Sequence, residues 1–122
     1  MAEQLGITMA IDNKQNRLRI HKPTLHALGD PRLIQLLINV EQGALAIRAV
    51  KRKEKNGHEI RITEKELCGK DFELHSQMLV SQLRKWCGNM SENQTYRLTG
   101  TLHDKYPMVL FPFKTLVQVD SE

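Results

Sequence analysis

The stretch Ile20-His-Lys-Pro-Thr-Leu-His-Ala-Leu-Gly29 decides how the first half of the chain is organised. Pro23 suits the first turn of a helix, where its missing N–H costs nothing, and Leu25 and Leu28 fall on one helical face. Gly29 can adopt the left-handed conformation that ends a helix, and the Asp-Pro that follows prevents any continuation. The stretch therefore predicts one short helix between two pairs of strands.

A β-hairpin is expected before this helix and another after it. Ile7–Ile11 and Arg17–Ile20 both alternate apolar and polar residues, so the leucine and isoleucine of the second segment should face the core. Leu33–Ile38 is almost entirely apolar, which is typical of a strand buried on both faces, and Ala44–Val50 returns alongside it. The order of elements is ββαββ.

The same order recurs after residue 58. His58–Thr63 and Asp71–His75 alternate as strands do, with a loop between them. An apolar stripe at helical spacing predicts a helix over Gln77–Cys87, and the serine just before it is a good N-cap. Tyr96–Leu102 and Met108–Phe111 then predict a hairpin.

This repeated order predicts a single domain over residues 1–122, made of halves 6–50 and 58–120 joined by the basic linker 51–57. One half has too few strands to close a sheet, whereas two halves can pair their edges. We therefore expect a mainly β protein with helices (α+β), folded as one closed barrel of two intertwined ββαββ halves.

The composition is that of an ordinary soluble protein, with 40% hydrophobic and 26% charged residues among 122. The longest apolar runs are far too short to span a bilayer, and the first residues lack the pattern of a signal peptide. Cys68 and Cys87 are too few for a disulfide framework. We expect a cytoplasmic protein with free thiols and no membrane contact.

The charge is unevenly distributed along the chain. Residues 1–57 hold ten Lys/Arg against five Asp/Glu, whereas residues 58–122 hold eight against nine. A basic half is what nucleic-acid binding would require, but the same charges could simply keep the protein soluble.

The segments Gly6-Ile7, Ile11-Asp12, Arg17-Leu-Arg-Ile20 and Leu28-Gly29 resemble the swapped-hairpin DNA-binding domain of the AbrB, SpoVT and MraZ type, in its tandem single-chain form. That motif has an Asp near the hairpin turn, an Arg after it, a short helix that ends in Leu-Gly, and two further strands. The resemblance implies a cradle-loop barrel of interlocked hairpins and DNA binding through arginines of the hairpin face.

Some features of that family are missing from this chain. Its Ile-Pro dipeptide is replaced by Ile20-His21, and the basic pair of its short helix falls on Leu25 and His26. Arg17 does match the arginine that follows the turn. The resemblance therefore favours the fold more than it favours DNA binding.

Basic side chains on the first hairpin and in the linker are the candidate nucleic-acid contacts. Each could neutralise a phosphate and add to a salt-dependent affinity. The alternatives are a solvated strand face that discourages edge pairing, and an ordinary polar linker. The candidate residues are Lys14, Arg17, Arg19, Lys22, Lys51, Arg52 and Lys53.

Catalytic and metal sites are not indicated. His21 and His75 occupy matching positions, and a pseudo-twofold axis could bring them together, but no further ligands are spaced to complete a metal site. Cys87 lies on the apolar helix stripe, so it is interpreted as a core residue and not as a nucleophile. We expect no enzymatic activity, no metal and no cofactor.

Two functions remain open at this stage. The first is a small bacterial or phage-type DNA-binding transcriptional regulator that contacts the duplex backbone. The alternative is a non-catalytic accessory barrel of a phage or mobile element. It binds another protein through Met108–Phe113 and a short final strand that holds Leu116, Val117 and Val119, and it binds no nucleic acid. The sequence does not decide between a monomer and a homodimer.

Overall fold

A computed structural model describes residues 6–52, 59–69, 71–88, 90–103 and 107–120. In chain order, its elements are β1 (Thr8–Asp12), β2 (Arg17–Ile20), α1 (Lys22–Ala27), β3 (Leu33–Asn39), β4 (Ala44–Ala49), β5 (Ile60–Arg61), α2 (Glu64–Cys68), β6 (Phe72–His75), α3 (Gln77–Cys87), β7 (Thr95–Thr99), β8 (Thr101–His103), β9 (Met108–Pro112), the 3-10 turn η1 (Phe113–Thr115) and β10 (Val117–Val119).

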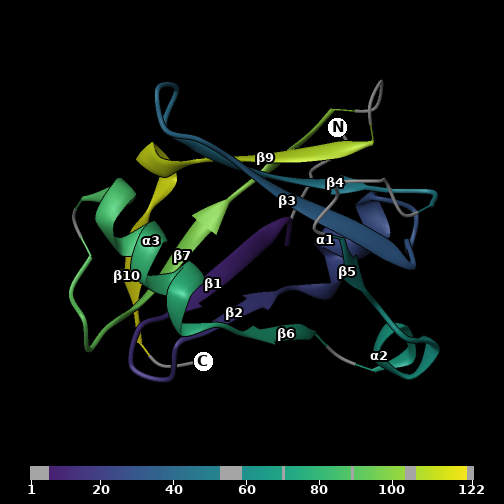
Figure 1. The fold of residues 1–122 in the computed structure, drawn as a ribbon, viewed down its shortest axis with the longest axis horizontal. Helices are drawn as coiled ribbons and strands as arrows, with labels where there is room; N and C mark the ends of the chain where they lie inside the picture. The colour runs from purple at the N-terminus through teal and green to yellow at the C-terminus, as the bar shows by residue number, and fades with distance from the viewer. Residues whose placement is uncertain (1–5, 53–58, 70, 89, 104–106, 121–122) are drawn as a thin grey trace.

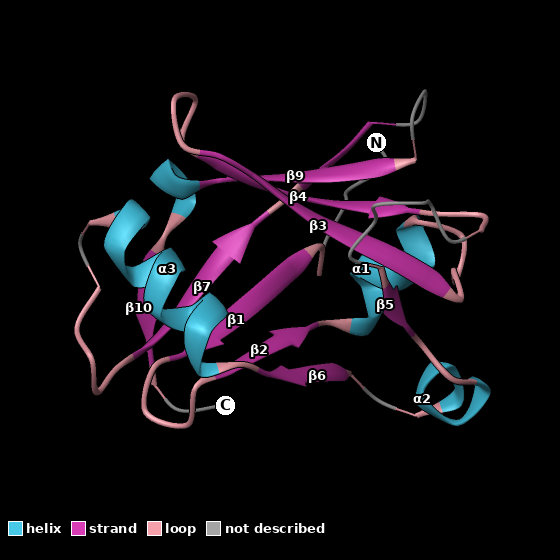
Figure 2. Ribbon diagram, viewed as in Figure 1, coloured by secondary structure: helices cyan, strands magenta, loops and turns pink. Residues whose placement is uncertain are grey.

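The strands form two five-stranded antiparallel sheets (Figures 1 and 2). The first sheet has the order β10-β7-β1-β2-β6, and the second sheet has the order β5-β3-β4-β9-β8. The β1–β2 hairpin lies between β7 and β6, and the β3–β4 hairpin lies between β5 and β9. Both sheets thus combine strands from before residue 50 with strands from after residue 58, and the prediction of a mainly β protein with helices is confirmed.

The expected closed barrel does not form among the described residues. Each sheet keeps two edge strands, β10 and β6 in the first sheet and β5 and β8 in the second. Instead of continuing as a strand beyond Arg61, the chain enters α2, a helix where the sequence predicted a loop. Thr63 and Glu66 form a capping box there: the Thr63 Oγ1 accepts from the Glu66 N–H at 3.2 Å, and the Glu66 carboxylate accepts from the Thr63 N–H at 2.9 Å.

The hydrophobic core is built from alternate residues of both sheets. Leu18 and Ile20 of β2 are fully buried, as their alternation predicted, and Leu45 and Ile47 of β4 join them. The expected burial of Leu33–Ile38 on both faces is wrong, because every second side chain of β3 points away from the core and Leu37 is 40% exposed.

The two predicted helices are confirmed, and Figure 1 shows them at opposite ends of the molecule. In α1, Pro23 stands in the first turn, and the chain turns after Leu28 through Gly29 at φ +85°. In α3, the Ser76 hydroxyl caps the N-terminus by accepting from the Leu79 N–H at 3.1 Å, and Gly88 ends the helix at φ +81°. Both helices add buried side chains to the core.

Gly100 marks the point where the chain leaves the first sheet and enters the second. It separates β7 from β8, and its N–H donates to the Ile7 carbonyl at 2.8 Å. A Cβ at this position would lie 2.6 Å from Val109 Cγ1 and 2.7 Å from the Phe111 ring, and both of these side chains are completely buried. Only a residue without a side chain fits here.

We expect Gly100→Ala to lower the free energy of unfolding by about 1–3 kcal/mol, because a methyl group would have to push two packed core side chains aside. Chemical denaturation of the wild type and the variant measures the loss. Gly69→Ala is the matched control, since its Cβ would meet backbone oxygens at ordinary distances of 3.4 and 3.5 Å. Equal stability of the two variants would contradict this account of the crossing.

Candidate functional site

The two arginines of β2 lie on the face of the first sheet that points away from the core. Arg17 is in register with Asp12 of β1 and His75 of β6, and Arg19 is in register with Ala10 and Glu73. Opposed residues of antiparallel strands share a face, and Leu18 and Ile20 occupy the other one. Arg17 and Arg19 therefore point the same way, as the sequence predicted.

Both guanidinium groups are already bound to carboxylates. A single oxygen of Glu73, Oε2, accepts from Arg19 Nη2 at 2.7 Å, from Arg19 Nε at 3.1 Å and from Arg17 Nη1 at 3.3 Å. Arg17 Nη2 also donates to Asp12 Oδ2 at 2.9 Å. We call these four residues the arginine cluster. The side chains of Arg17 and Arg19 are only 14% and 21% exposed, and their contacts with neighbouring residues hold them in one orientation.

The acidic partners alter the expected electrostatics of this face. The sequence left open whether Arg17 and Arg19 contact phosphates or form a solvated strand face, but in the folded protein Glu73 and Asp12 neutralise much of their field. Glu73 could not be assigned to them from the sequence, because it lies more than fifty positions away and meets them only through the β2–β6 pairing. What remains is a preoriented pair of arginines with one carboxylate between them.

A third arginine on the same face was not among the sequence candidates. Arg97 of β7 is in register with Ala10, which in turn is in register with Arg19, so the three lie in one row across β7, β1 and β2. Ala10 is only 2% exposed, which is consistent with long arginine stems on either side of it. The alternation of β7 puts Arg97 on the outward side, but only the pairing of β7 with β1 places it beside the hairpin.

The remaining basic candidates do not all join this cluster. Lys14 is exposed in the β1–β2 turn, where Asp12 Oδ1 accepts from the Lys14 and Gln15 N–H groups at 3.1 Å each. Lys22 lies beyond the other end of β2, and its Nζ donates to the Gly69 carbonyl at 2.5 Å. Lys51 and Arg52 are exposed after β4 in the second sheet, and Lys53 lies outside the described residues.

His21 and His75 lie at opposite ends of β2, and Cys87 lies on α3. The register of β2 with β6 puts His75 opposite Arg17, whereas His21 follows the other end of β2 and bonds to the Thr8 hydroxyl. The expectation that a pseudo-twofold axis brings His21 and His75 together is therefore wrong. Burial raises the pKa of the half-buried Cys87 thiol to about 11, so it stays protonated at neutral pH. Across the described residues, no group of three or more His, Cys, Asp or Glu side chains could hold a metal ion.

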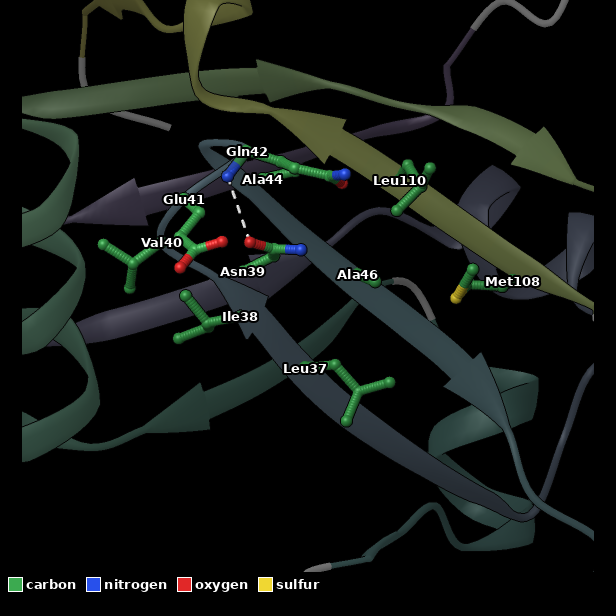
Figure 3. Close-up of a pocket in the computed structure, with 10 residues that line it drawn as sticks. All are labelled: Leu37, Ile38, Asn39, Val40, Glu41, Gln42, Ala44, Ala46, Met108 and Leu110. Carbon is green, nitrogen blue, oxygen red and sulfur yellow. Dashed lines mark hydrogen bonds between the residues drawn. The ribbon is translucent and has the colours of Figure 1, made fainter.

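A second outward surface lies on the second sheet. Leu37 of β3, Ala46 of β4 and Leu110 of β9 form one row in register, and Figure 3 shows them with their neighbours around a shallow hollow. Val40, in the turn after β3, is 53% exposed. We call this surface the outer apolar face; it consists of Leu37, Val40, Ala44, Ala46, Met108 and Leu110. Sequence analysis proposed Met108–Phe113 as an apolar contact but missed the contribution of β3, because β3 was expected to be covered on both sides.

Comparison with protein-family models, with curated proteins and with solved structures finds no match in any of the three. In the part of the chain that the structure describes, no helix is both long and apolar enough to cross a membrane.

The arginine cluster makes stability depend on pH. Partial burial opposes ionisation of Glu73, but the hydrogen bond from Arg19 and the charges of Arg17 and Arg19 outweigh it, so the pKa of Glu73 lies below its ordinary value of 4.5. A carboxyl group with a lowered pKa stabilises the folded state above its ordinary pKa, and that contribution is lost as the pH falls through the lower, folded-state value.

We therefore expect wild type to be more stable than Glu73→Gln at pH 7, and this difference to shrink as the pH falls below 4.5. Urea denaturation of both proteins at several pH values measures it, and the subtraction removes the contributions of all other carboxyl groups. A difference that stays constant down to the lowest pH would show that the Glu73 charge does not stabilise the fold.

Proposed function

We propose that this protein is a small DNA-binding regulator that contacts the backbone of duplex DNA through the arginine cluster, with Lys14 and Arg97 beside it. The observation that supports this proposal is the pair of guanidinium groups held side by side on an outward hairpin face. Planar guanidinium groups bind phosphate oxygens with two parallel hydrogen bonds, and preorientation reduces the entropy lost on binding. Contacts of this kind position a protein on DNA without reading its sequence.

The interleaving of the strands supports the same proposal. A swapped-hairpin arrangement requires each hairpin of one half to lie between strands of the other half. The β1–β2 hairpin lies between β6 and β7, and the β3–β4 hairpin lies between β5 and β9. We therefore propose that residues 6–50 and 58–120 are interlocked halves related to the swapped-hairpin family, with open sheet edges. Arg17 occupies the position of the arginine that follows the hairpin turn in that family.

Glu73 affects how Arg17 and Arg19 could bind a phosphate. Its Oε2 occupies the position where a phosphate oxygen would accept hydrogen bonds from Arg17 and Arg19. Since Glu73 is exposed on the edge strand β6, it can swing away when a phosphate arrives. The carboxylate thus keeps the arginines aligned in the free protein and competes with DNA for them.

A cytoplasmic location is part of this proposal. Cys87 is a free thiol, as expected in a compartment that keeps cysteines reduced. We infer that transcriptional control of a bacterial or phage type is the process served, since arginines held on one hairpin can position a small protein on duplex DNA.

We expect the wild type to bind random duplex DNA at about 50 mM salt, with an affinity that falls steeply as salt rises. Arg19→Ala should weaken binding and lower the salt slope by about one, because one phosphate contact is lost. Fluorescence anisotropy with a labelled duplex at several salt concentrations measures both. The matched control is Arg32→Ala, since Arg32 is an exposed arginine paired with Glu64 of α2 and lies outside the cluster. If the wild type does not bind, or if both variants behave alike, the proposal is wrong.

Glu73→Gln should bind the duplex more tightly than wild type, because the competing negative charge is removed while a hydrogen-bond acceptor is kept. Glu64→Gln makes the same change of net charge at the exposed pair with Arg32 and should leave the affinity nearly unchanged. If the two variants gain the same affinity for DNA, the gain reflects net charge in general and not a phosphate site at the arginine cluster.

A second candidate function is a non-catalytic accessory module that binds protein and no nucleic acid. The outer apolar face favours it, because exposed apolar patches of this kind usually mark interaction sites. If this protein fails to bind duplex DNA at low salt, the accessory function is favoured over the DNA-binding function.

A further inference from the structure

The outer apolar face has two kinds of side chain arranged in strips along its strands. The central strand β4 carries the small residues Ala44 and Ala46, and the larger Leu37 and Leu110 stand on the strands at either side (Figure 3). Leu37 is 40% exposed. Apolar side chains of three neighbouring strands therefore lie side by side on this face, and another apolar surface can cover them.

The two ends of this face carry opposite charges. Glu41 lies in the β3–β4 turn at one end and is exposed. Arg48 lies at the other end of β4, where its Nε and Nη2 donate to Gln35 Oε1 of β3 at 3.1 and 2.6 Å. The face is therefore apolar in the middle, negative at the turn and positive at the opposite end of the hairpin.

We propose that the outer apolar face binds a second copy of this chain. The twofold axis lies in the plane between the two copies and runs perpendicular to the strands. It passes between the row of Leu37 and Ala46 and the row of Asn39 and Ala44. Twofold packing of this kind stacks β3, β4 and β9 on the same strands of the partner copy, so that their larger side chains meet across the interface. It also brings Glu41 of each copy against Arg48 of the other.

The charges at the two ends of the face favour this twofold axis over the other axis that would also stack the two faces. An axis parallel to the strands would stack turn on turn and place Glu41 against Glu41, which is repulsive. The antiparallel stacking instead makes the face complementary to itself, as an isologous interface requires. This self-complementarity is the reason for choosing a second copy over an unrelated protein.

The proposal does not rest on DNA binding, because it uses the opposite side of the molecule. The arginine cluster is on the first sheet and the outer apolar face is on the second, and the core lies between the two sheets. In the dimer the two arginine clusters would face outward in opposite directions. Each copy would then present its own cluster to a separate segment of duplex.

Analytical ultracentrifugation of the purified chain over a range of concentrations tests the proposal. We expect wild type to sediment as a dimer and Leu37→Glu to raise the dimer dissociation constant by about tenfold or more, because a charge would be buried in an apolar contact. Val117→Glu is the matched control: it puts the same charge on an exposed apolar strand residue of the first sheet and should leave the dimer intact. Thermal unfolding followed by circular dichroism verifies that each variant is folded.

Charge reversal distinguishes this dimer from any other. Glu41→Arg should weaken the dimer, and so should Arg48→Glu, whereas the double variant should recover most of the loss because the pair is restored with its signs exchanged. The proposal is overturned if wild type is monomeric at every concentration. The proposal is also overturned if Leu37→Glu leaves the dimer intact. It is overturned as well if the double variant dimerises no more tightly than either single variant. A monomeric wild type that still binds duplex DNA would overturn the dimer alone.

Discussion

The structure depends on the insertion of the β1–β2 hairpin between β7 and β6. Two strands alone would leave both hydrogen-bonding edges open and one apolar face in water, a state that is at best marginally stable. Strands from after residue 58 supply both neighbours, and β7 continues through Gly100 into the second sheet. The two sheets are therefore joined by one bent segment, and their core residues are buried together.

The same pairing creates the arginine cluster. The β2–β6 register brings Glu73 against Arg17 and Arg19, so an acid from one half of the chain sets the charge of a hairpin from the other half. Without β6 the two arginines would keep only the Arg17–Asp12 contact within the hairpin. With β6 in place, Arg17 and Arg19 share the Glu73 carboxylate, so the proposed phosphate contact would have to displace it.

The molecule presents two outward faces of opposite character. The first sheet shows arginines and carboxylates, and the second shows the outer apolar face with a charge at each end. A charged face and an apolar face on opposite sides can bind two different surfaces at once. Self-association through one side and phosphate binding through the other are therefore compatible, and a dimer of this form would hold two duplex segments apart.

Local patterns in the sequence determined the elements whose geometry is local. The cap at Ser76, the stop at Gly88 and the inward Leu18 and Ile20 follow from side-chain spacing and backbone preference, and each was predicted correctly. The sequence also contains the capping-box residues Thr63 and Glu66, but the segment that follows Thr63 was predicted to be a loop. Tertiary structure alone decided the rest. The partners of Arg17, the exposure of Leu37 and the crossing at Gly100 depend on which distant strands pair and in which register, and no periodicity within a short segment encodes that choice.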